Sequence, residues 1–166
     1  TTEPYVTQVE FLSPGPYNSG FQIRIHFSEP VDSTALVVTF GSTSPYNTYT
    51  VSGSQHNDTC WMGTVGINSS VPSGTYHFAI DGAVDYAGNA MVPDAATSFV
   101  VDTTRPTITD LEFDRSEPMG LGVFNMTMEF SEDMNTSSPV IVEMYTDGVT
   151  VYTINGSWLN ARVWEG

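Results

Sequence analysis

The stretch FQIRIHF (Phe21–Phe27) alternates strictly between apolar and polar side chains. A period of two predicts a β-strand with one buried face and one solvent face. Period-two alternation dominates residues 1–101, six more short strands are expected there, and no window has the apolar stripe of a helix. These further strands are expected at Val6–Phe11, Leu36–Phe40, Thr48–Val51, Cys60–Val65, Thr75–Ile80 and Ser98–Val101.

Clusters of Pro, Gly, Asn and Ser separate these runs and predict the turns between strands. Seven short strands punctuated in this way within about 100 residues are typical of a β-sandwich. We therefore expect an all-β fold. The turn clusters lie at Ser13–Pro16, Pro45–Asn47, Pro72–Gly74 and Ala87–Asn89.

The whole pattern returns later in the chain. TTEPYVTQVEF (Thr1–Phe11) returns as TTRPTITDLEF (Thr103–Phe113), a shift of 102 residues, and FQIRIHFSE (Phe21–Glu29) returns as FNMTMEFSE (Phe124–Glu132), a shift of 103. Trp61 and Gly63 likewise return as Trp164 and Gly166. This repetition predicts two tandem β-sandwiches, at residues 1–102 and 103–166, of about seven strands per complete unit.

The second repeat stops at the counterpart of Gly63, so nothing in it corresponds to residues 64–102. We expect this incomplete sandwich to expose strand edges and apolar core faces. Two ways of completing it stay open: a strand donated by a neighbouring subunit, or the continuation of the same chain. Between the repeats, Pro106 disfavours helix at Arg105. The joint is therefore expected to be extended and stiff, setting the modules end to end as a rod.

The chain is strongly acidic. Four Arg and no Lys stand against 19 Asp and Glu, giving a net charge of −15 over 166 residues. Such a surface repels nucleic acid and anionic lipid, so neither is an expected partner. No apolar run is long enough to insert this segment directly into a membrane. The lack of Lys also excludes isopeptide crosslinks between Lys and Asn or Asp.

The chain is acidic and lysine-free, but only 14% of its residues are charged. This composition favours an extracellular, cell-surface location over the cytoplasm of a halophilic organism. Five of the nine asparagines lie in N-x-Ser/Thr sequons, which predicts N-glycosylation. The alternative is a Ser/Thr-rich β-protein with accidental sequons. The candidate glycosylation sites are Asn57, Asn68, Asn125, Asn135 and Asn155.

Several short sequence segments resemble those of the Ig-like domains that occur as tandem repeats in bacterial and archaeal surface-layer proteins, adhesins and extracellular filaments. They are FSEPVD (Phe27–Asp32), FSEDMN (Phe130–Asn135), DYAGNAM (Asp85–Met91) and VDTTRP (Val101–Pro106). The resemblance implies tandem Ig-like sandwiches with a structural role at the cell surface, and it carries no catalytic residues. The second repeat departs from it, because that repeat has no DxAGN-like segment and no closing strand.

The sequence contains only weak evidence for a metal site or for catalytic residues. Clustered oxygen ligands suit calcium, but no known calcium loop is present, and turn capping explains the same residues. The three histidines are scattered, so neither a His-based metal site nor a nucleophile relay is expected, and no cofactor is predicted. The calcium candidates are Glu29, Asp32, Asp81, Asp85, Asn89 and Asp102.

Two aromatic positions and one thiol have alternative interpretations. Trp61 and Trp164 are expected to pack between the sheets, the alternative being an exposed platform for a sugar ring. Cys60, the only cysteine, excludes an internal disulfide and is either a buried apolar residue or a thiol used between chains.

The sequence thus predicts a non-enzymatic structural protein that acts by rigid spacing and self-association. Its expected partners are copies of itself or further repeats of the same chain, with surface glycans as a further potential partner. The alternative is a spacer or carbohydrate-binding module of a secreted hydrolase. That alternative needs exposed aromatic side chains on one face, with Tyr46, Tyr49 and Tyr152 as candidates.

Overall fold

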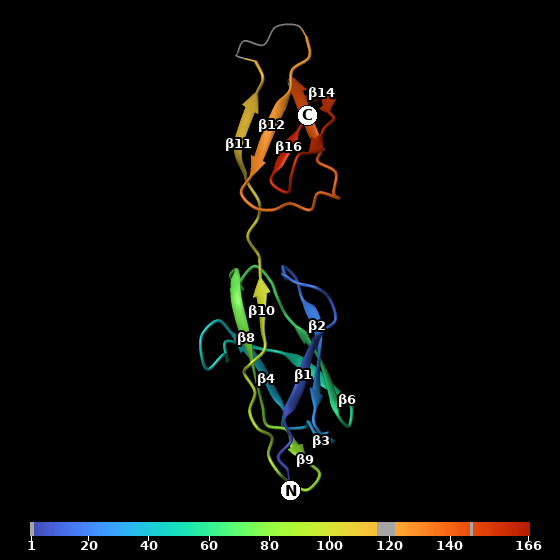
Figure 1. Cartoon of the computed structure of the whole chain (residues 1–166), viewed down its shortest axis with the longest axis vertical. Helices are drawn as coiled ribbons and strands as arrows, with labels where there is room; N and C mark the ends of the chain where they lie inside the picture. The colour runs from blue at the N-terminus through green and yellow to red at the C-terminus, as the bar shows by residue number, and fades with distance from the viewer. Residues whose placement is uncertain (1, 116–121, 147) are drawn as a thin grey trace. The chain divides into compact units, whose positions relative to one another are not determined.

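The computed structural model describes residues 2–115, 122–146 and 148–166. These residues form β-strands, turns and loops, and none of them is helical. No membrane-spanning helix is therefore found among them. The chain divides into two compact units, Thr1–Thr104 and Arg105–Gly166 (Figure 1). The sequence placed this boundary after Asp102.

Unit 1 (Thr1–Thr104) is a sandwich of two four-stranded antiparallel sheets, with a short strand pair beside them (Figure 1). The first sheet has the order β1 (Val6–Phe11), β2 (Phe21–Phe27), β7 (Cys60–Val65) and β6 (Ser52–Asn57). The second has the order β10 (Ser98–Val101), β8 (Gly74–Asp81), β4 (Val37–Gly41) and β5 (Tyr49–Thr50). The additional pair is β3 (Val31–Asp32) with β9 (Val84–Asp85).

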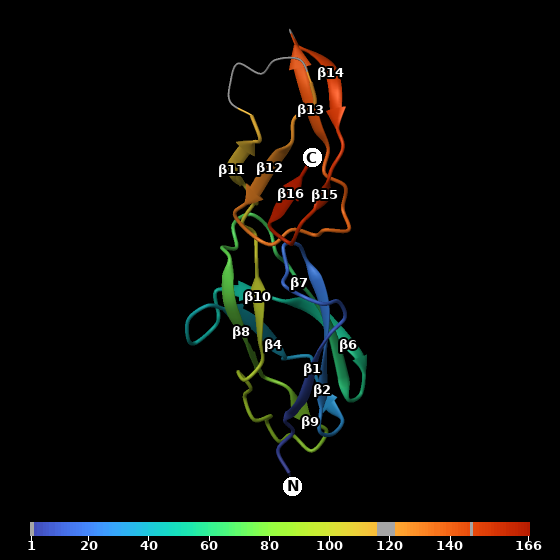
Figure 2. The ribbon, with the colours of Figure 1, turned by 45° about the horizontal axis from the view of Figure 1, so that its top comes forward.

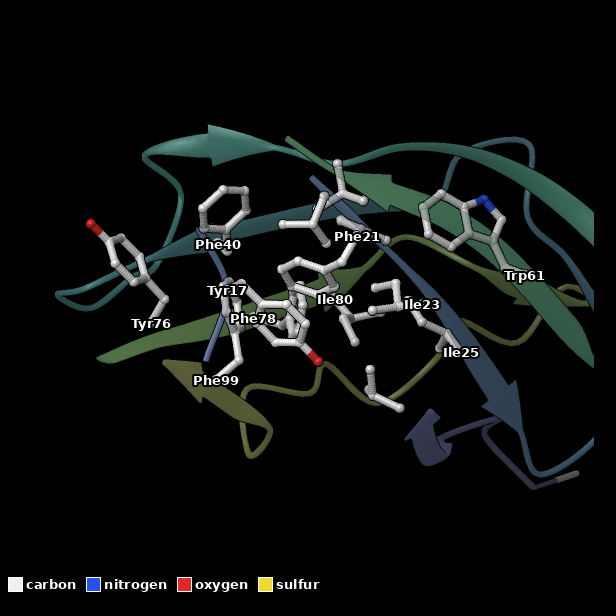
Figure 3. Close-up of a cluster of buried hydrophobic side chains, with 14 of the residues drawn as sticks. Tyr17, Phe21, Ile23, Ile25, Phe40, Trp61, Tyr76, Phe78, Ile80 and Phe99 are labelled. Carbon is white, nitrogen blue, oxygen red and sulfur yellow. The ribbon is translucent and has the colours of Figure 1, made fainter. Parts of the chain in front are cut away.

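The alternation in β2 produces the core of unit 1. Ile23 and Ile25 are fully buried, and Phe21 and Phe27 are each 5% exposed. Phe40 and Phe78 enter the same core from the second sheet and are also fully buried (Figure 3). Burying apolar side chains from both inner faces is the main stabilising contribution to a sandwich.

Trp61 belongs to this core, as predicted, because only 5% of it is exposed. Glycines make room for its ring on two adjacent strands. An added Cβ at Gly53 in β6 would lie 2.4 Å from the indole Cζ2, and one at Gly63 in β7 would lie 2.3 Å from Cη2. The two glycines therefore form a slot that a larger residue would close. Cys60 is also buried, at 3% exposure, and its thiol is unpaired.

Unit 2 (Arg105–Gly166) rebuilds the first sheet of unit 1. Its four strands have the order β11 (Ile108–Phe113), β12 (Met126–Phe130), β16 (Val163–Glu165) and β15 (Ser157–Trp158). A hairpin of β13 (Val142–Thr146) and β14 (Val149–Ile154) accompanies this sheet (Figure 2). Trp164 is 2% exposed and occupies the same kind of slot, between Gly156 and Gly166.

The described residues of unit 2 include no counterpart of β8 or β10. Positions that are covered in unit 1 are accordingly exposed in unit 2. Leu111 is 46% exposed whereas its counterpart Val9 is 8% exposed. Met144 pairs with Tyr152 as Phe40 pairs with the equivalent Tyr49, and Met144 is 41% exposed whereas Phe40 is fully buried. Among the described residues of unit 2, the buried core consists of Met126, Met128 and Trp164, with partly buried residues around them.

Candidate functional site

Ser73 anchors the segment that leaves unit 1. Its hydroxyl oxygen accepts hydrogen bonds from the backbone N–H groups of Thr103 at 2.9 Å and Thr104 at 3.1 Å. The Thr103 hydroxyl donates to the Val71 carbonyl at 3.0 Å, and the Asp102 carboxylate accepts the Thr104 N–H at 3.1 Å. Residues 102–104 are therefore fixed to the loop between β7 and β8, although they form no strand.

Most of the calcium candidates already accept hydrogen bonds from neighbouring groups of the protein. Asp85 Oδ1 accepts the N–H groups of Ala87 and Asn89, each at 2.8 Å, and its Oδ2 accepts the Asn89 side-chain amide at 2.6 Å. The hydrogen bonds from Asn89, more than any other contact, lower the pKa of the Asp85 carboxyl. Gly88 completes this turn with φ of +89°.

The remaining calcium candidates lie in separate turns. Asp32 Oδ1 accepts the Thr34 N–H at 2.8 Å, and Asp81 Oδ1 accepts the Gly82 N–H at 2.7 Å. Glu29 is partly buried just after β2, and Asp102 belongs to the Ser73 anchor. Within residues 2–115, 122–146 and 148–166, no group of three or more His, Cys, Asp or Glu side chains is placed to share a metal ion.

The three histidines lie on different strands of unit 1. His26 in β2 contacts Glu10 through Nε2 at 3.2 Å, and this hydrogen bond, with help from Arg24, lowers the pKa of Glu10. His56 is exposed in β6, and His77 in β8 stacks against Tyr46 at 4.8 Å between ring centroids. The structure therefore does not bring the histidines together.

Three of the predicted sequons adopt the same local geometry. The side-chain oxygens of Asn57, Asn68 and Asn135 accept the backbone N–H two residues later, at 3.0, 2.8 and 3.1 Å. Each such turn is exposed. Asn125 differs, because its side-chain nitrogen donates to Asp114 Oδ2 at 3.1 Å, and Asn155 is exposed between β14 and β15.

The three candidate tyrosines have different surroundings. Tyr46 has φ of 60° and stacks on His77. Tyr49 packs on the core, with its ring 4.8 Å from that of Phe40, and its hydroxyl donates to the Ser70 carbonyl at 3.4 Å. Tyr152 in β14 is 66% exposed.

A groove that the sequence did not reveal occurs at equivalent positions in both units. In unit 1 it has a volume of about 520 Å³ and lies between the segment after β3 and strand β6. In unit 2 it has a volume of about 510 Å³ and lies between residues 136–140 and β15. The unit 1 groove is lined by Ser33, Thr34, Leu36, Val51, Ser52, Gly53, Ser54, Gln55 and Trp61. The unit 2 groove is lined by Thr136, Ser137, Ser138, Pro139, Val140, Gly156, Ser157, Trp158 and Trp164.

No protein-family model matches the chain. A search of curated proteins also found no match. Among solved structures, the chain is similar to domains 1–6 of the surface layer protein SbsC, with 14% identity and a TM-score of 0.39 over 90% of this chain and 31% of that one.

It is also similar to the N-terminal part of the bacterial S-layer protein SbsC, with 15% identity and a TM-score of 0.39 over 78% of this chain and 41% of that one. The chain thus spans less than half the length of these solved chains. At this identity and TM-score the likeness carries no argument about function.

Proposed function

We propose that this chain is a non-enzymatic, extracellular structural protein, a repeat module of a cell-surface filament, surface layer, stalk or adhesin. The observation that carries the proposal is the duplication of one scaffold. The features that recur in both units, the four-stranded sheet and the Trp slot between two glycines, all build the fold. Tandem repetition of a scaffold extends a protein in space and multiplies its contact surfaces.

Rigid spacing is supported by the Ser73 anchor. A module array transmits spacing only if the chain leaving each module is held in place. Ser73 accepts hydrogen bonds directly from the backbone of Thr103 and Thr104, so unit 1 holds its own last residues in place. Pro106 then restricts the backbone at the start of unit 2.

Self-association through strand completion is supported by β13. In unit 1 the equivalent strand β4 pairs with β8, with Val38 opposite Ile80 and Phe40 opposite Phe78. Among the described strands of unit 2, β13 pairs only with β14. We propose that β13 accepts an antiparallel strand with alternating apolar residues, as in β8, from a neighbouring copy or from further residues of the same polypeptide.

Electron microscopy of the native assembly, at a resolution that traces the chain, tests this proposal. The expected result is an ordered array of sandwiches in which a strand pairs with β13. A strand from another copy would make the protein a polymerising subunit, and a strand of its own chain would make it part of a longer repeat array. Native protein that remains a dispersed monomer with β13 uncovered would contradict the proposed self-association.

The alternative role, a spacer or carbohydrate-binding module of a secreted hydrolase, draws support from one observation, the uncharged and hydroxyl-rich groove. The three tyrosines that are candidates for sugar contact can be tested directly. Replacing Tyr46, Tyr49 and Tyr152 should weaken polysaccharide retention if they form the binding surface. Unchanged retention would exclude those tyrosines as the platform.

A further inference from the structure

The two grooves share a chemistry that is unusual for this chain. Although the net charge is −15, none of the residues lining either groove is charged. Each groove is lined by four hydroxyl side chains and by a buried tryptophan, Trp61 or Trp164. A charge-free, hydroxyl-lined surface on an acidic protein selects for neutral polar ligands, because an anionic ligand is repelled and a cationic one finds no carboxylate there.

One lining position differs between the units in an informative way. Gln55 in unit 1 corresponds to Trp158 in unit 2. The Gln55 amide is used internally, since its oxygen accepts the Ser33 hydroxyl at 3.1 Å and its nitrogen donates to the Val31 carbonyl at 2.8 Å. Trp158 instead gives the unit 2 groove an aromatic wall, positioned by Phe130 at 5.4 Å between ring centroids and by an indole hydrogen bond to the Ser138 carbonyl at 3.5 Å.

The hydroxyl groups also differ in availability. In unit 1 the hydroxyls of Ser33 and Thr34 donate to Gln55 and Asp32. In unit 2, the hydrogen bonds found between described residues use none of the hydroxyls of Thr136, Ser137, Ser138 or Ser157. These groups are therefore free to exchange a hydrogen bond with water for one with a ligand.

We propose that the unit 2 groove binds a neutral saccharide segment, with Trp158 stacking on a sugar ring and the four hydroxyls pairing with sugar hydroxyls. Sugar rings have apolar C–H faces and polar edges, and an aromatic wall beside hydroxyl donors and acceptors matches both. The volume of about 510 Å³ lies in the range of small-molecule sites. The unit 1 groove, with Gln55 in place of the aromatic wall, binds the same class more weakly. This inference is independent of the proposed structural role.

Two sources could supply a neutral saccharide to this groove. One is free or surface polysaccharide, and the other is a glycan attached to the chain itself, since Asn135 immediately precedes the lining residue Thr136. Protein made in a host without N-glycosylation presents an open groove to added sugar. If an attached glycan is the occupant, protein made in a glycosylating host loses binding of added sugar, and the Asn135→Gln variant from that host regains it.

The test is an NMR titration of the intact chain with cellobiose, maltose and N,N′-diacetylchitobiose at millimolar concentrations. We expect at least one probe to shift the amide resonances of residues 136–140 and 156–158 in a saturable way. Trp158→Gln introduces the residue that unit 1 has at this position, and it should weaken binding about tenfold or more. The reciprocal Gln55→Trp should strengthen binding at the unit 1 groove.

The matched control is Tyr152→Ser, which removes an exposed aromatic side chain from β14, outside the groove. Binding that survives in Tyr152→Ser and falls in Trp158→Gln supports the groove. Loss in Tyr152→Ser with retention in Trp158→Gln would overturn it and transfer binding to the tyrosine. Absence of saturable shifts with all three sugars in the unglycosylated protein would also overturn the proposal.

Discussion

The tryptophan slot leads to a quantitative prediction, which is that Gly63→Ala strongly destabilises unit 1. The new Cβ would lie 2.3 Å from the indole Cη2 and Cζ3 and 3.0 Å from Val51 Cγ1. Carbon atoms do not approach so closely, so either the indole or strand β7 must move. Because Trp61 is only 5% exposed and packs within the core, its ring has little room to shift.

Overpacking of a well-filled core costs about 1–3 kcal/mol, and the closeness of these contacts places Gly63→Ala near 3 kcal/mol. For a unit of this size, that loss lowers the melting temperature by roughly 12–24 °C. Gly66→Ala is the matched control, because no heavy atom lies within 4 Å of its added Cβ. Neither glycine has a positive φ, so alanine meets no backbone strain at either position. The control variant should match the parent or exceed its stability slightly.

Urea unfolding of the intact chain, monitored through the NMR resonances of β2 and β8, measures the stability of unit 1 separately from that of unit 2. A double-mutant cycle identifies the cause. Trp61→Phe removes the outer indole atoms that the new methyl group meets, so Gly63→Ala should cost about 1–2 kcal/mol less in that background. An equal cost in both backgrounds, or a cost below about 0.5 kcal/mol in the parent, would refute the slot as the reason for this glycine.

Four further predictions follow from the other contacts. Ser73→Ala should accelerate amide hydrogen exchange at Thr103 and Thr104, because both N–H groups lose their acceptor, whereas replacement of the exposed Ser69 should not. Asp85 has a lowered pKa in the folded state, so its contribution to stability is present above the carboxyl's ordinary pKa and is lost as pH falls through the folded value. The Asp85→Asn variant should therefore lose less stability than the parent on acidification below about pH 4, as measured by urea unfolding. Secretion from a glycosylating host followed by mass spectrometry should give higher occupancy at Asn57, Asn68 and Asn135 than at Asn125, whose amide nitrogen is engaged by Asp114. Calcium at millimolar concentration should leave the melting temperature unchanged, because the Asp85 carboxylate already accepts three protein donors; a rise that a chelator abolishes would contradict this.

The sequence predicted those strands whose side chains alternate. Burial of every second residue in β2 creates a period that can be read directly, and seven expected strands correspond to β1, β2, β4, β5, β7, β8 and β10. Strand β6 was not predicted, because its sequence SGSQHN has no apolar residue and all six positions are exposed. Its strand conformation comes from pairing with β7, a tertiary effect that local pattern does not encode.

The grooves were not predictable for a related reason. In unit 1 their lining residues come from residues 33–36, from residues 51–55 and from Trp61 in β7, and the second of these segments includes part of the unpredicted strand β6. Serine and threonine in such segments look like ordinary loop residues until the fold brings them together. The duplication contained a usable signal, however: Gly53 and Trp61 return as Gly156 and Trp164, whereas Gln55 is replaced by Trp158.

Comparison of the two units separates scaffold from variable surface. A residue that recurs at the equivalent position and makes the same contact in both units contributes to the fold of the module. Thr7 and Thr109 are an example, because their hydroxyls donate to equivalent carbonyls of the neighbouring strand at 3.0 and 3.1 Å. Where the strand is kept but the side chain changes from amide to indole, as at Gln55 and Trp158, each unit holds its own residue with different contacts. Position 158 is therefore where the two repeats differ in the chemistry of the groove, and exchanging these two residues tests whether the indole determines ligand binding.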